Sequence, residues 1–436
     1  MFTGQKEQSS RKQSGKIVVG YDLGKRMSQI SFCAPDGSDA ETISSVAGTE
    51  QYNIPTILCK RPGVNQWFYG KEAIKYIRED GGIPVEDLLT LAQRGEEVVV
   101  EGESYDPAAL LTLFVKRSLS LLSMRVPLNK IEALMFTVED LTPRMVDVLG
   151  KVAGGLQLNG VAIYFQSYLE SFYHYMLYQP KELWQYKVVI FDYDGAMKTL
   201  SLECNKKTTP QVVFISEKEY PDFTRISWPE EEAAKAHMKQ KLDSRFLQVA
   251  EEAVSDGIVS TVYLLGDGFK EEWADESIRM LCRTRRVFQG NNLYSRGACF
   301  GAVERLCPGP EGKNHVFLGK DKLKSNIGMR VRRRGEDSYY AIMDAGKNWY
   351  ETTADFEVIL DAGNVLEFVI IPLTGEELKD RRIVLEGLPE RPERTTRLRI
   401  HMEMAAVNQA VVTTEDMGFG ELYPSSGKGW THSISV

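Results

Sequence analysis

Long hydrophobic runs, paired cysteines and an excess of basic charge are all missing from this chain of 436 residues. No apolar run approaches the roughly 20 residues that span a bilayer, so a membrane-spanning helix is not expected. Six scattered cysteines, none in a Cys-x-x-Cys pair, argue against a disulfide scaffold or a zinc cluster. The 53 basic and 61 acidic side chains give a net charge of −8, which does not support a nucleic-acid or anionic-membrane surface. A cytoplasmic location is therefore the default expectation.

The length of the chain allows at least two domains with substantial cores. Its first residues are polar and no hydrophobic signal segment follows them, so residues 1–14 are expected to be a disordered tail. Strands, turns and helices alternate up to about Pro310, and short strands dominate beyond it. We therefore predict an α/β domain over residues 15–310, a linker over 311–325 and a β-sandwich over 326–436.

One sequence pattern occurs twice in the first domain. Residues 187–202 contain an unbroken apolar run, then a turn with two carboxylates and a glycine, then an alternating return. This pattern predicts a buried strand that enters a hairpin. Residues 16–32 have the same form, and Asp22 stands near the end of the first strand as Asp192 does in the later copy. Two such copies predict two related half-domains, each offering a turn to one shared cleft.

Helix signals separate the predicted strands. Asp106-Pro107 and Thr142-Pro143 each combine an N-cap residue with proline at the first helical position. Ser167 to Glu170 has the spacing of a capping box at the start of an aromatic-rich helix. Further helices are predicted over residues 230–256, over about 271–282, and around the small residues 297–302, where backbones would approach closely.

The order of these turns resembles the nucleotide-binding domain of the actin, sugar-kinase and DnaK-type heat-shock chaperone superfamily. The series is Asp-Leu-Gly at 22–24, Phe-Asp-x-x-Gly at 191–195, Gly-x-Gly at 266–268 and a Gly-Ala-x-x-Gly-Ala helix at 297–302. The chaperone branch fits best, because residues 100–107 and 152–156 resemble that family in order and spacing. Residues 385–389 resemble part of the chaperones' substrate-binding β-domain. Because the chain stops at Val436, we expect the family's helical lid to be absent.

The resemblance implies a two-lobed actin-like ATPase domain of the ribonuclease-H type, followed by a sandwich like the chaperone substrate-binding β-domain. It also implies ATP or ADP with Mg²⁺ as cofactors. Backbone groups of glycine-rich turns hold phosphates, and carboxylates retain the hydrated cation. Asp22 and Asp192 match the metal-holding and catalytic positions. The nucleotide-binding positions map to Gly24, Lys25, Arg26, Asp194, Gly195, Gly266, Asp267, Gly268 and Lys270.

The turns also depart from the family pattern. Lys25 and Arg26 replace two threonines of the first turn, and the second turn has Asp194 where the family has glycine. A carboxylate about 4 Å from bound phosphate costs on the order of 4 kcal/mol at an effective dielectric near 20, unless Lys25 or Arg26 offsets it. Ser167 stands roughly where the chaperones carry a glutamate that takes part in hydrolysis. Any activity would be a Mg²⁺-dependent ATPase of the DnaK type, and we expect it to be weak or absent.

Two interpretations of the cleft stay open at this stage. In the first, a nucleotide binds between the lobes and hydrolysis is slow or lost. In the second, Asp22, Asp192 and Asp194 pair with Lys25 and Arg26 across an empty cleft, which leaves an inert scaffold.

The expected function is that of a DnaK-like protein that binds polypeptide through its β-domain. Partners would be polypeptides or proteins, with no nucleic acid and no membrane, and a monomer is expected. Without a lid, bound peptide should exchange quickly. The alternative is an actin-like scaffold or signalling protein that uses its lobes as a partner interface; a small-molecule kinase is the weakest class. A run of arginines at positions 330 and 332–334 is interpreted as a solvated face.

Overall fold

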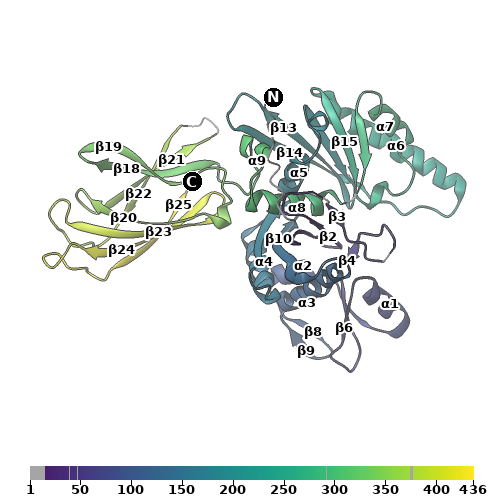
Figure 1. The fold of residues 1–436 in the computed structure, drawn as a ribbon, viewed down its shortest axis with the longest axis horizontal. Coiled ribbons are helices and arrows are strands. Elements are labelled where there is room, and N and C mark those ends of the chain that lie inside the picture. The colour runs from purple at the N-terminus through teal and green to yellow at the C-terminus, as the bar shows by residue number, and fades with distance from the viewer. Residues whose placement is uncertain (1–14, 39, 47, 291, 374–376) are drawn as a thin grey trace, which may run out of the picture. The chain divides into compact units, whose positions relative to one another are not determined.

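The computed structural model describes residues 15–436 apart from positions 39, 47, 291 and 374–376 (Figure 1). The predicted disordered tail, residues 1–14, lies outside the described residues. The chain divides into two compact units. The first contains residues up to 140, 147–204 and 215–314, and the second contains 141–146, 205–214 and 315–436. The protein is a mixed α/β protein with several sheets.

The first sheet of the first unit has the strand order β11-β10-β1-β2-β3, and β4 pairs with β2. Strand β1 is antiparallel to β2 and parallel to β10, which is in turn parallel to β11. All seven residues of β1 are buried, as its apolar run predicts. The strands are β1 (Ile17–Leu23), β2 (Met27–Cys33), β3 (Glu41–Thr42), β4 (Ile54–Pro55), β10 (Ile131–Val138) and β11 (Ala162–Ser167).

The second sheet repeats this order as β16-β15-β12-β13-β14. Strand β12 is antiparallel to β13 and parallel to β15, just as β1 is to β2 and β10. Both predicted hairpins are therefore present and occupy equivalent places in two sheets of the same topology. The strands are β12 (Lys187–Asp192), β13 (Ala196–Asn205), β14 (Gln211–Thr224), β15 (Val259–Leu265) and β16 (Arg286–Gln289). We call the halves of the first unit built on these two sheets its lobes.

Two helices follow equivalent strands of the two lobes: α5 (Tyr168–Leu177) follows β11 and α8 (Leu293–Leu306) follows β16. These helices cross closely at Gly297, where an added Cβ would fall 2.0 Å from the carbonyl oxygen of Ser171. The close backbone approach predicted for the small-residue helix is thus confirmed.

The remaining helices largely follow their start signals. Asp106 caps α3 (Pro107–Leu119) because its side chain accepts hydrogen bonds from two backbone N–H groups. Thr142 caps α4 (Pro143–Leu156) in the same way, with its hydroxyl accepting from one backbone N–H group. The stretch 107–124 is long and apolar enough to cross a membrane by length and composition, but half of it is buried, as in a core helix of a folded domain. The helix predicted at 271–282 is present as α7 (Asp275–Leu281), which is shorter because it begins four residues later.

Two small sheets, two short helices and the long helix α6 also belong to the first unit. A three-stranded sheet has the order β6-β5-β7, and β8 pairs with β9. These elements are β5 (Leu58–Lys60), β6 (Trp67–Tyr69), β7 (Ile83–Val85), β8 (Val98–Val100), β9 (Glu103–Tyr105), α1 (Gly70–Asp80), α2 (Leu88–Arg94) and α6 (Glu232–Ser255). The expected linker contains α9 (Pro310–Asn314) and β17 (His315–Phe317), and β17 pairs with residues 211–213 at the start of β14.

The second unit consists of two four-stranded antiparallel sheets, ordered β19-β18-β21-β22 and β20-β23-β24-β25. Inward residues of both sheets form one core, as the strict alternation of buried and exposed residues along β23 illustrates. This is the β-sandwich that the sequence predicts. Its strands are β18 (Ser325–Arg333), β19 (Glu336–Met343), β20 (Thr353–Leu360), β21 (Val365–Pro372), β22 (Lys379–Val384), β23 (Thr396–Ala406), β24 (Gln409–Gly418) and β25 (Gly429–Ser435).

Candidate functional site

The two hairpin aspartates occupy equivalent positions near the ends of β1 and β12. Asp22 is buried and Asp192 is half-buried. The hydroxyl of Tyr168 donates to Asp22 Oδ1 at 2.7 Å, and the hydroxyl of Tyr294 donates to Asp192 Oδ2 at 2.9 Å. Each carboxylate that the sequence assigns to a metal thus accepts a hydrogen bond from a tyrosine of the protein itself.

The same two tyrosines join the lobes. Tyr168 is the first residue of α5 and Tyr294 is the second residue of α8. Their rings stack with centroids 4.2 Å apart and planes 6° from parallel. We call the four residues Asp22, Tyr168, Tyr294 and Asp192 the hairpin junction. It is a continuous chain from one hairpin strand to the other through two hydrogen bonds and one ring stack.

Burial changes the acidity of both carboxyl groups. Burial, together with the charges of Asp192 and Asp194, raises the pKa of Asp22 to about 7 against the opposing effect of the hydrogen bond from Tyr168. Burial also raises the pKa of Asp192 to about 6, although the hydrogen bond from Tyr294 lowers it. The junction therefore holds two carboxyl groups that ionise less readily than exposed ones.

The turns of the hairpins are linked to each other as well. A guanidinium nitrogen of Arg26 donates to the backbone carbonyl of Asp194 and lies 3.2 Å from its carboxylate. The cation that offsets Asp194 is therefore Arg26, through a direct contact between the two side chains. The expected pairing of Lys25 and Arg26 with all three aspartates is wrong for Asp22 and Asp192, which accept from the tyrosines instead.

Lys25 belongs to a different link, centred on Glu139. Lys25 Nζ lies 2.8 Å from one oxygen of Glu139, and Lys198 Nζ, from β13 of the other lobe, lies 2.6 Å from its second oxygen. Burial opposes ionisation of Glu139, but the two ammonium groups outweigh it and lower its pKa to about 2. Lys198 also lies 3.1 Å from Glu219, so this link is a small charge network.

The Gly-x-Gly loop is occupied by protein contacts too. Asp267 lies 2.8 Å from Lys270 Nζ and accepts from the amide of Asn53 at 3.3 Å. Asn53 in turn accepts from the amide of Gln29 on β2 at 2.6 Å, so this chain also crosses between lobes. The structure thus brings together the predicted residues Asp22, Arg26, Asp192, Asp194 and Asp267, each bound by side chains of the same unit.

The loop glycines are packed against protein rather than open. An added Cβ on Gly266 would lie 2.6 Å from the backbone of residues 193 and 194, and one on Gly268 would lie 2.2 Å from the ring of Tyr193. An added Cβ on Gly24 would lie 3.3 Å from the Tyr168 hydroxyl, whereas Gly195 meets nothing within 4 Å. Only Gly195 of these four presents an open backbone face.

These residues do not fit a hydrated Mg²⁺ with phosphate in the arrangement observed. One oxygen of each carboxylate that would accept from metal-bound water already accepts from a phenol hydroxyl, and Arg26 is held by Asp194. Among the described residues, no group of three or more His, Cys, Asp or Glu side chains is placed to hold a metal ion.

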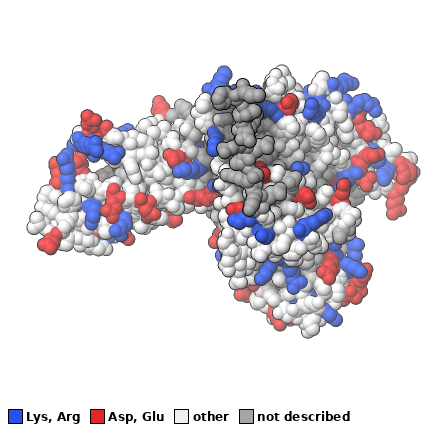
Figure 2. All heavy atoms as spheres, viewed as in Figure 1, with Lys and Arg blue, Asp and Glu red and all other residues white. Residues whose placement is uncertain are grey.

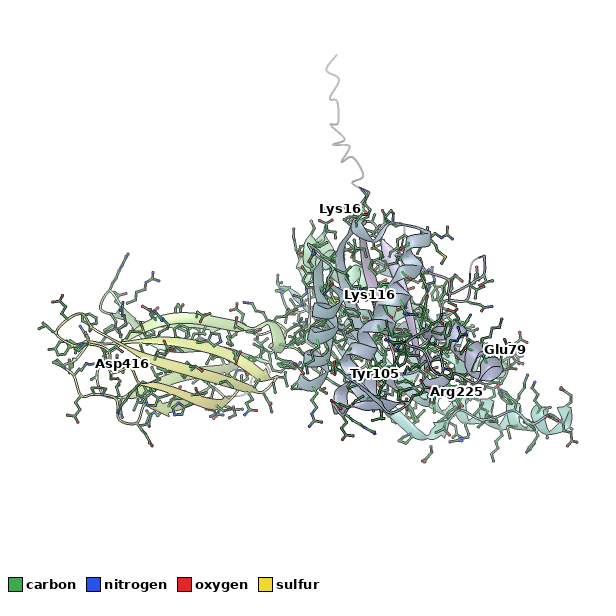
Figure 3. The ribbon with its side chains drawn as sticks, turned by 90° about the horizontal axis from the view of Figure 1, so that it is seen from below. Lys16, Glu79, Tyr105, Lys116, Arg225 and Asp416 are labelled. Atoms are coloured by element: carbon green, nitrogen blue, oxygen red, sulfur yellow. The ribbon has the colours of Figure 1, made fainter. Side chains whose placement is uncertain are left out.

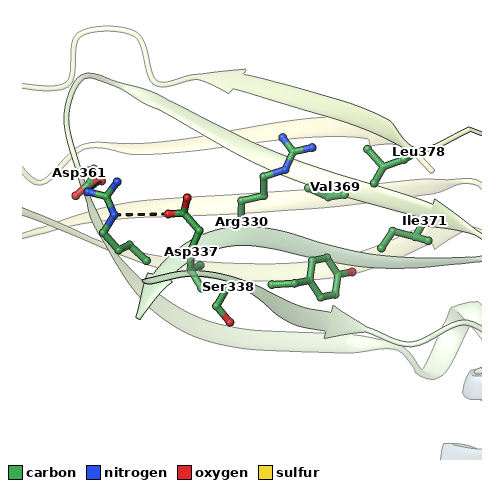
Figure 4. Close-up of a pocket in the computed structure, with 10 residues that line it drawn as sticks. Arg330, Asp337, Ser338, Asp361, Val369, Ile371 and Leu378 are labelled. Carbon is green, nitrogen blue, oxygen red and sulfur yellow. Dashed lines mark ion pairs between the residues drawn. The ribbon is translucent and has the colours of Figure 1, made fainter. Parts of the chain in front are cut away.

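The second unit contains a separate surface groove on the outer face of the sheet β19-β18-β21-β22 (Figure 4). The groove has a volume of about 560 Å³. Val369, Ile371, Leu378 and Tyr339 supply its apolar lining. Gly328 makes room for this lining, because an added Cβ there would lie 2.3 Å from the Tyr339 ring.

Charged side chains border the groove and are largely paired. Arg330 lies 3.2 Å from Asp380, and Arg332 lies 3.6 Å from Asp337 and 3.5 Å from Asp361. The arginine run is therefore an interspersed charged face, consistent with the mixture of red and blue side chains visible in Figure 2.

Sequence reasoning missed Tyr168, Tyr294, Glu139 and Asn53. An aromatic residue in the first turn of a helix is most simply interpreted as core. The available signal was positional. Each tyrosine lies in the first turn of the helix that follows the last strand of its lobe, so an alignment of the two lobes would have placed the two tyrosines at equivalent positions.

Two family models match the chain. The one described as "Family of unknown function (DUF5716) C-terminal" matches residues 39–320, and "Domain of unknown function (DUF8552)" matches residues 322–436. No curated protein matches the chain.

Proposed function

Because the chain belongs to the DUF5716 family of unknown function, whose description names no ligand, we propose a role from the geometry above. The protein is a DnaK-like, two-domain polypeptide-binding protein: the groove of its β-sandwich holds an extended peptide, and its first unit is an actin-like ATPase fold with a degenerate nucleotide site. The repeated strand order of the two lobes supports the fold assignment. Both the chaperone and the ATPase kinship rest on the sequence resemblance.

One observation carries the peptide-binding proposal: β21 is apolar on both of its faces beyond Glu367, an outward residue that pairs with Arg382. Its inward residues Leu366, Phe368 and Ile370 belong to the sandwich core, while Val369 and Ile371 face the groove. Strands of antiparallel sheets normally expose polar residues on a solvated face, and two-sided apolar strands belong to sheets that are covered on both sides. Val369 is already covered by its neighbours, but Ile371 is half-buried and Leu378 is 47% exposed, so an apolar side chain of a partner would cover these two residues.

The groove also suggests the chemistry of the peptide. Its apolar lining suits an aliphatic or aromatic side chain, and full burial of one such side chain contributes about 1.5–3 kcal/mol. Its border arginines are already paired with aspartates, so a strongly acidic or basic peptide gains little. We therefore expect modest affinity, rapid exchange, and selection for an apolar residue between neutral flanks.

Fluorescence anisotropy with labelled peptides tests this proposal. Leu378 is 47% exposed at the groove, so Leu378→Asp should leave the fold intact and weaken binding of apolar peptides at least tenfold. Leu422 is 86% exposed in the same unit and does not line the groove, so Leu422→Asp is the matched control. Equal affinity of both variants, or no binding to a library of apolar peptides, would refute the groove as the binding site.

A second candidate is the actin-like scaffold, in which the lobes form a partner interface. The links between the two lobes favour it, because they connect the lobes through side chains of the protein itself. Sedimentation velocity separates the candidates: concentration-dependent oligomers or filaments that persist in the Leu378→Asp variant support the scaffold, and a monomer that binds peptide supports the first proposal.

A further inference from the structure

We propose that Tyr168 and Tyr294 form an internal latch that takes the place of a metal–phosphate group between the two hairpins. The latch satisfies both hairpin aspartates and fills the space between them, so the lobes close without any ligand. This inference concerns the first unit alone and does not depend on whether the second unit binds peptide.

The first argument is the geometry of the junction. A bound hydrated cation would connect the two carboxylates through water molecules that donate hydrogen bonds. Tyr168 and Tyr294 provide the same donors from the protein, at 2.7 Å and 2.9 Å, and their ring stack replaces the central group. A cation that bridged the two aspartates along this line would have to displace the two hydroxyls and the ring stack.

The second argument is the placement of the tyrosines. Each one lies in the first turn of the helix that follows the last strand of its own lobe, and each donates a hydrogen bond to the aspartate of that same lobe. The stack is then the step that crosses from lobe to lobe. Neither ring is fully buried, and neither tyrosine belongs to the fully buried core. A tyrosine that served packing alone would have no reason to direct its hydroxyl at the hairpin aspartate of its own lobe.

The third argument is that two further ionic contacts connect the same two lobes. Arg26 holds Asp194, and Glu139 lies between Lys25 and Lys198. These contacts use the basic residues that replace the threonines of the first turn. These links therefore add to the contact between the two hairpins.

Binding of Mn²⁺ to the full chain, followed by electron paramagnetic resonance of the free ion, tests the latch. The unmodified protein should show no binding up to about 1 mM Mn²⁺. The double variant Tyr168→Ala and Tyr294→Ala opens the space and frees both carboxylates, so its affinity should rise at least tenfold. Adding Asp22→Asn to that variant should abolish the gain. Tyr175→Ala, on the same helix but packed against Tyr263, is the matched control and should bind no metal.

Two results would overturn the proposal. One is binding of Mn²⁺ by the unmodified protein well below 1 mM; the other is a folded double alanine variant that gains no affinity. If the alanine variant does not fold, the double variant Tyr168→Phe and Tyr294→Phe decides, since it keeps both rings. Loss of the hydroxyls should then accelerate amide hydrogen exchange in the turns 24–26 and 193–195 at least tenfold. Unchanged exchange rates there would overturn the latch.

Discussion

The buried carboxylates of the two units differ in what surrounds them. In the second unit, Asp416 (labelled in Figure 3) has a completely buried side chain. It accepts hydrogen bonds from two guanidinium nitrogens of Arg391, both at 2.8 Å, and from the backbone N–H groups of Gly418 and Ser426. The hydrogen bonds from Arg391 hold the pKa of Asp416 well below its usual range. In the first unit, Asp22 and Asp192 accept from neutral phenols and their pKa values rise.

This difference separates a structural carboxylate from a candidate functional one. Asp416 is charged and fully compensated, and it fixes the loop that follows β24. Asp22 and Asp192 are desolvated without a cation of their own, an arrangement that folding alone does not favour and that is typical of sites evolved for another purpose. This combination is the reason for our proposal that the two tyrosines take the place of a ligand at the junction.

The largest expected effect comes from breaking the compensated pair. Arg391→Ala leaves the charge of Asp416 buried and unpaired, so the second unit should lose about 3–5 kcal/mol of unfolding free energy. Urea unfolding monitored by region-resolved hydrogen exchange measures this loss. Arg330→Ala, which removes an exposed partner of Asp380, is the control and should cost less than about 1 kcal/mol. Similar losses in both variants would contradict the assigned difference.

The two units should also respond to pH in opposite directions. The folded-state pKa values of Asp22 and Asp192, about 7 and 6, lie above their unfolded values, so the folded first unit holds protons that the unfolded chain releases. Its unfolding free energy should therefore fall by a few kcal/mol as pH rises from about 4 to 7. Asp416 has a lowered pKa, so the second unit should lose stability as pH falls below about 4. Region-resolved hydrogen exchange at pH 5 and 8 measures the first trend, and Asp22→Asn should reduce it.

A smaller effect is expected from one hydroxyl of the latch. Tyr168→Phe removes the donor to Asp22 while it keeps the ring stack, which should destabilise the first unit by about 1–3 kcal/mol, more at pH 8 than at pH 5. Thermal unfolding detects the change. Tyr186→Phe, at a tyrosine that is 48% exposed, is the control; an equal shift in both variants would remove the special role of Tyr168.

The smallest effect should come from the exposed link between the turns. Both side chains of the Arg26–Asp194 pair are about half exposed, so Arg26→Ala should change unfolding free energy by less than about 1 kcal/mol. High salt should remove what little stability the pair contributes. A loss comparable with that of Arg391→Ala would mean that the turn contact, rather than the tyrosine stack, holds the lobes together.

Local signals in the sequence predicted the elements well, because strand periodicity and helix caps depend on neighbouring residues. The hairpin strands, the caps at Asp106 and Thr142 and the sandwich strands all follow from such signals. The start of α7 was predicted too early. The acidic residues at 271–272 suit a first helical turn, but they precede the helix, which begins at Asp275.

The hairpin junction is formed by contacts between residues more than 100 positions apart. Local sequence patterns do not specify such contacts, so the junction could not be predicted from them. Tyr168 and Asp22 are 146 residues apart, and Tyr294 and Asp192 are 102 apart. The sequence identified the aspartates through the turns that carry them, yet nothing local to either tyrosine indicates a carboxylate partner. The same reason explains why Lys25 was expected to pair with an aspartate and instead pairs with Glu139.

Isothermal titration of the full chain with ATP and Mg²⁺ tests most directly the claim that the first unit is closed by its own side chains. We expect no saturable heat up to about 1 mM nucleotide at either pH 5 or pH 8. Saturable binding in the micromolar range by the unmodified protein would contradict the account, because the latch could not then occupy the place of the ligand.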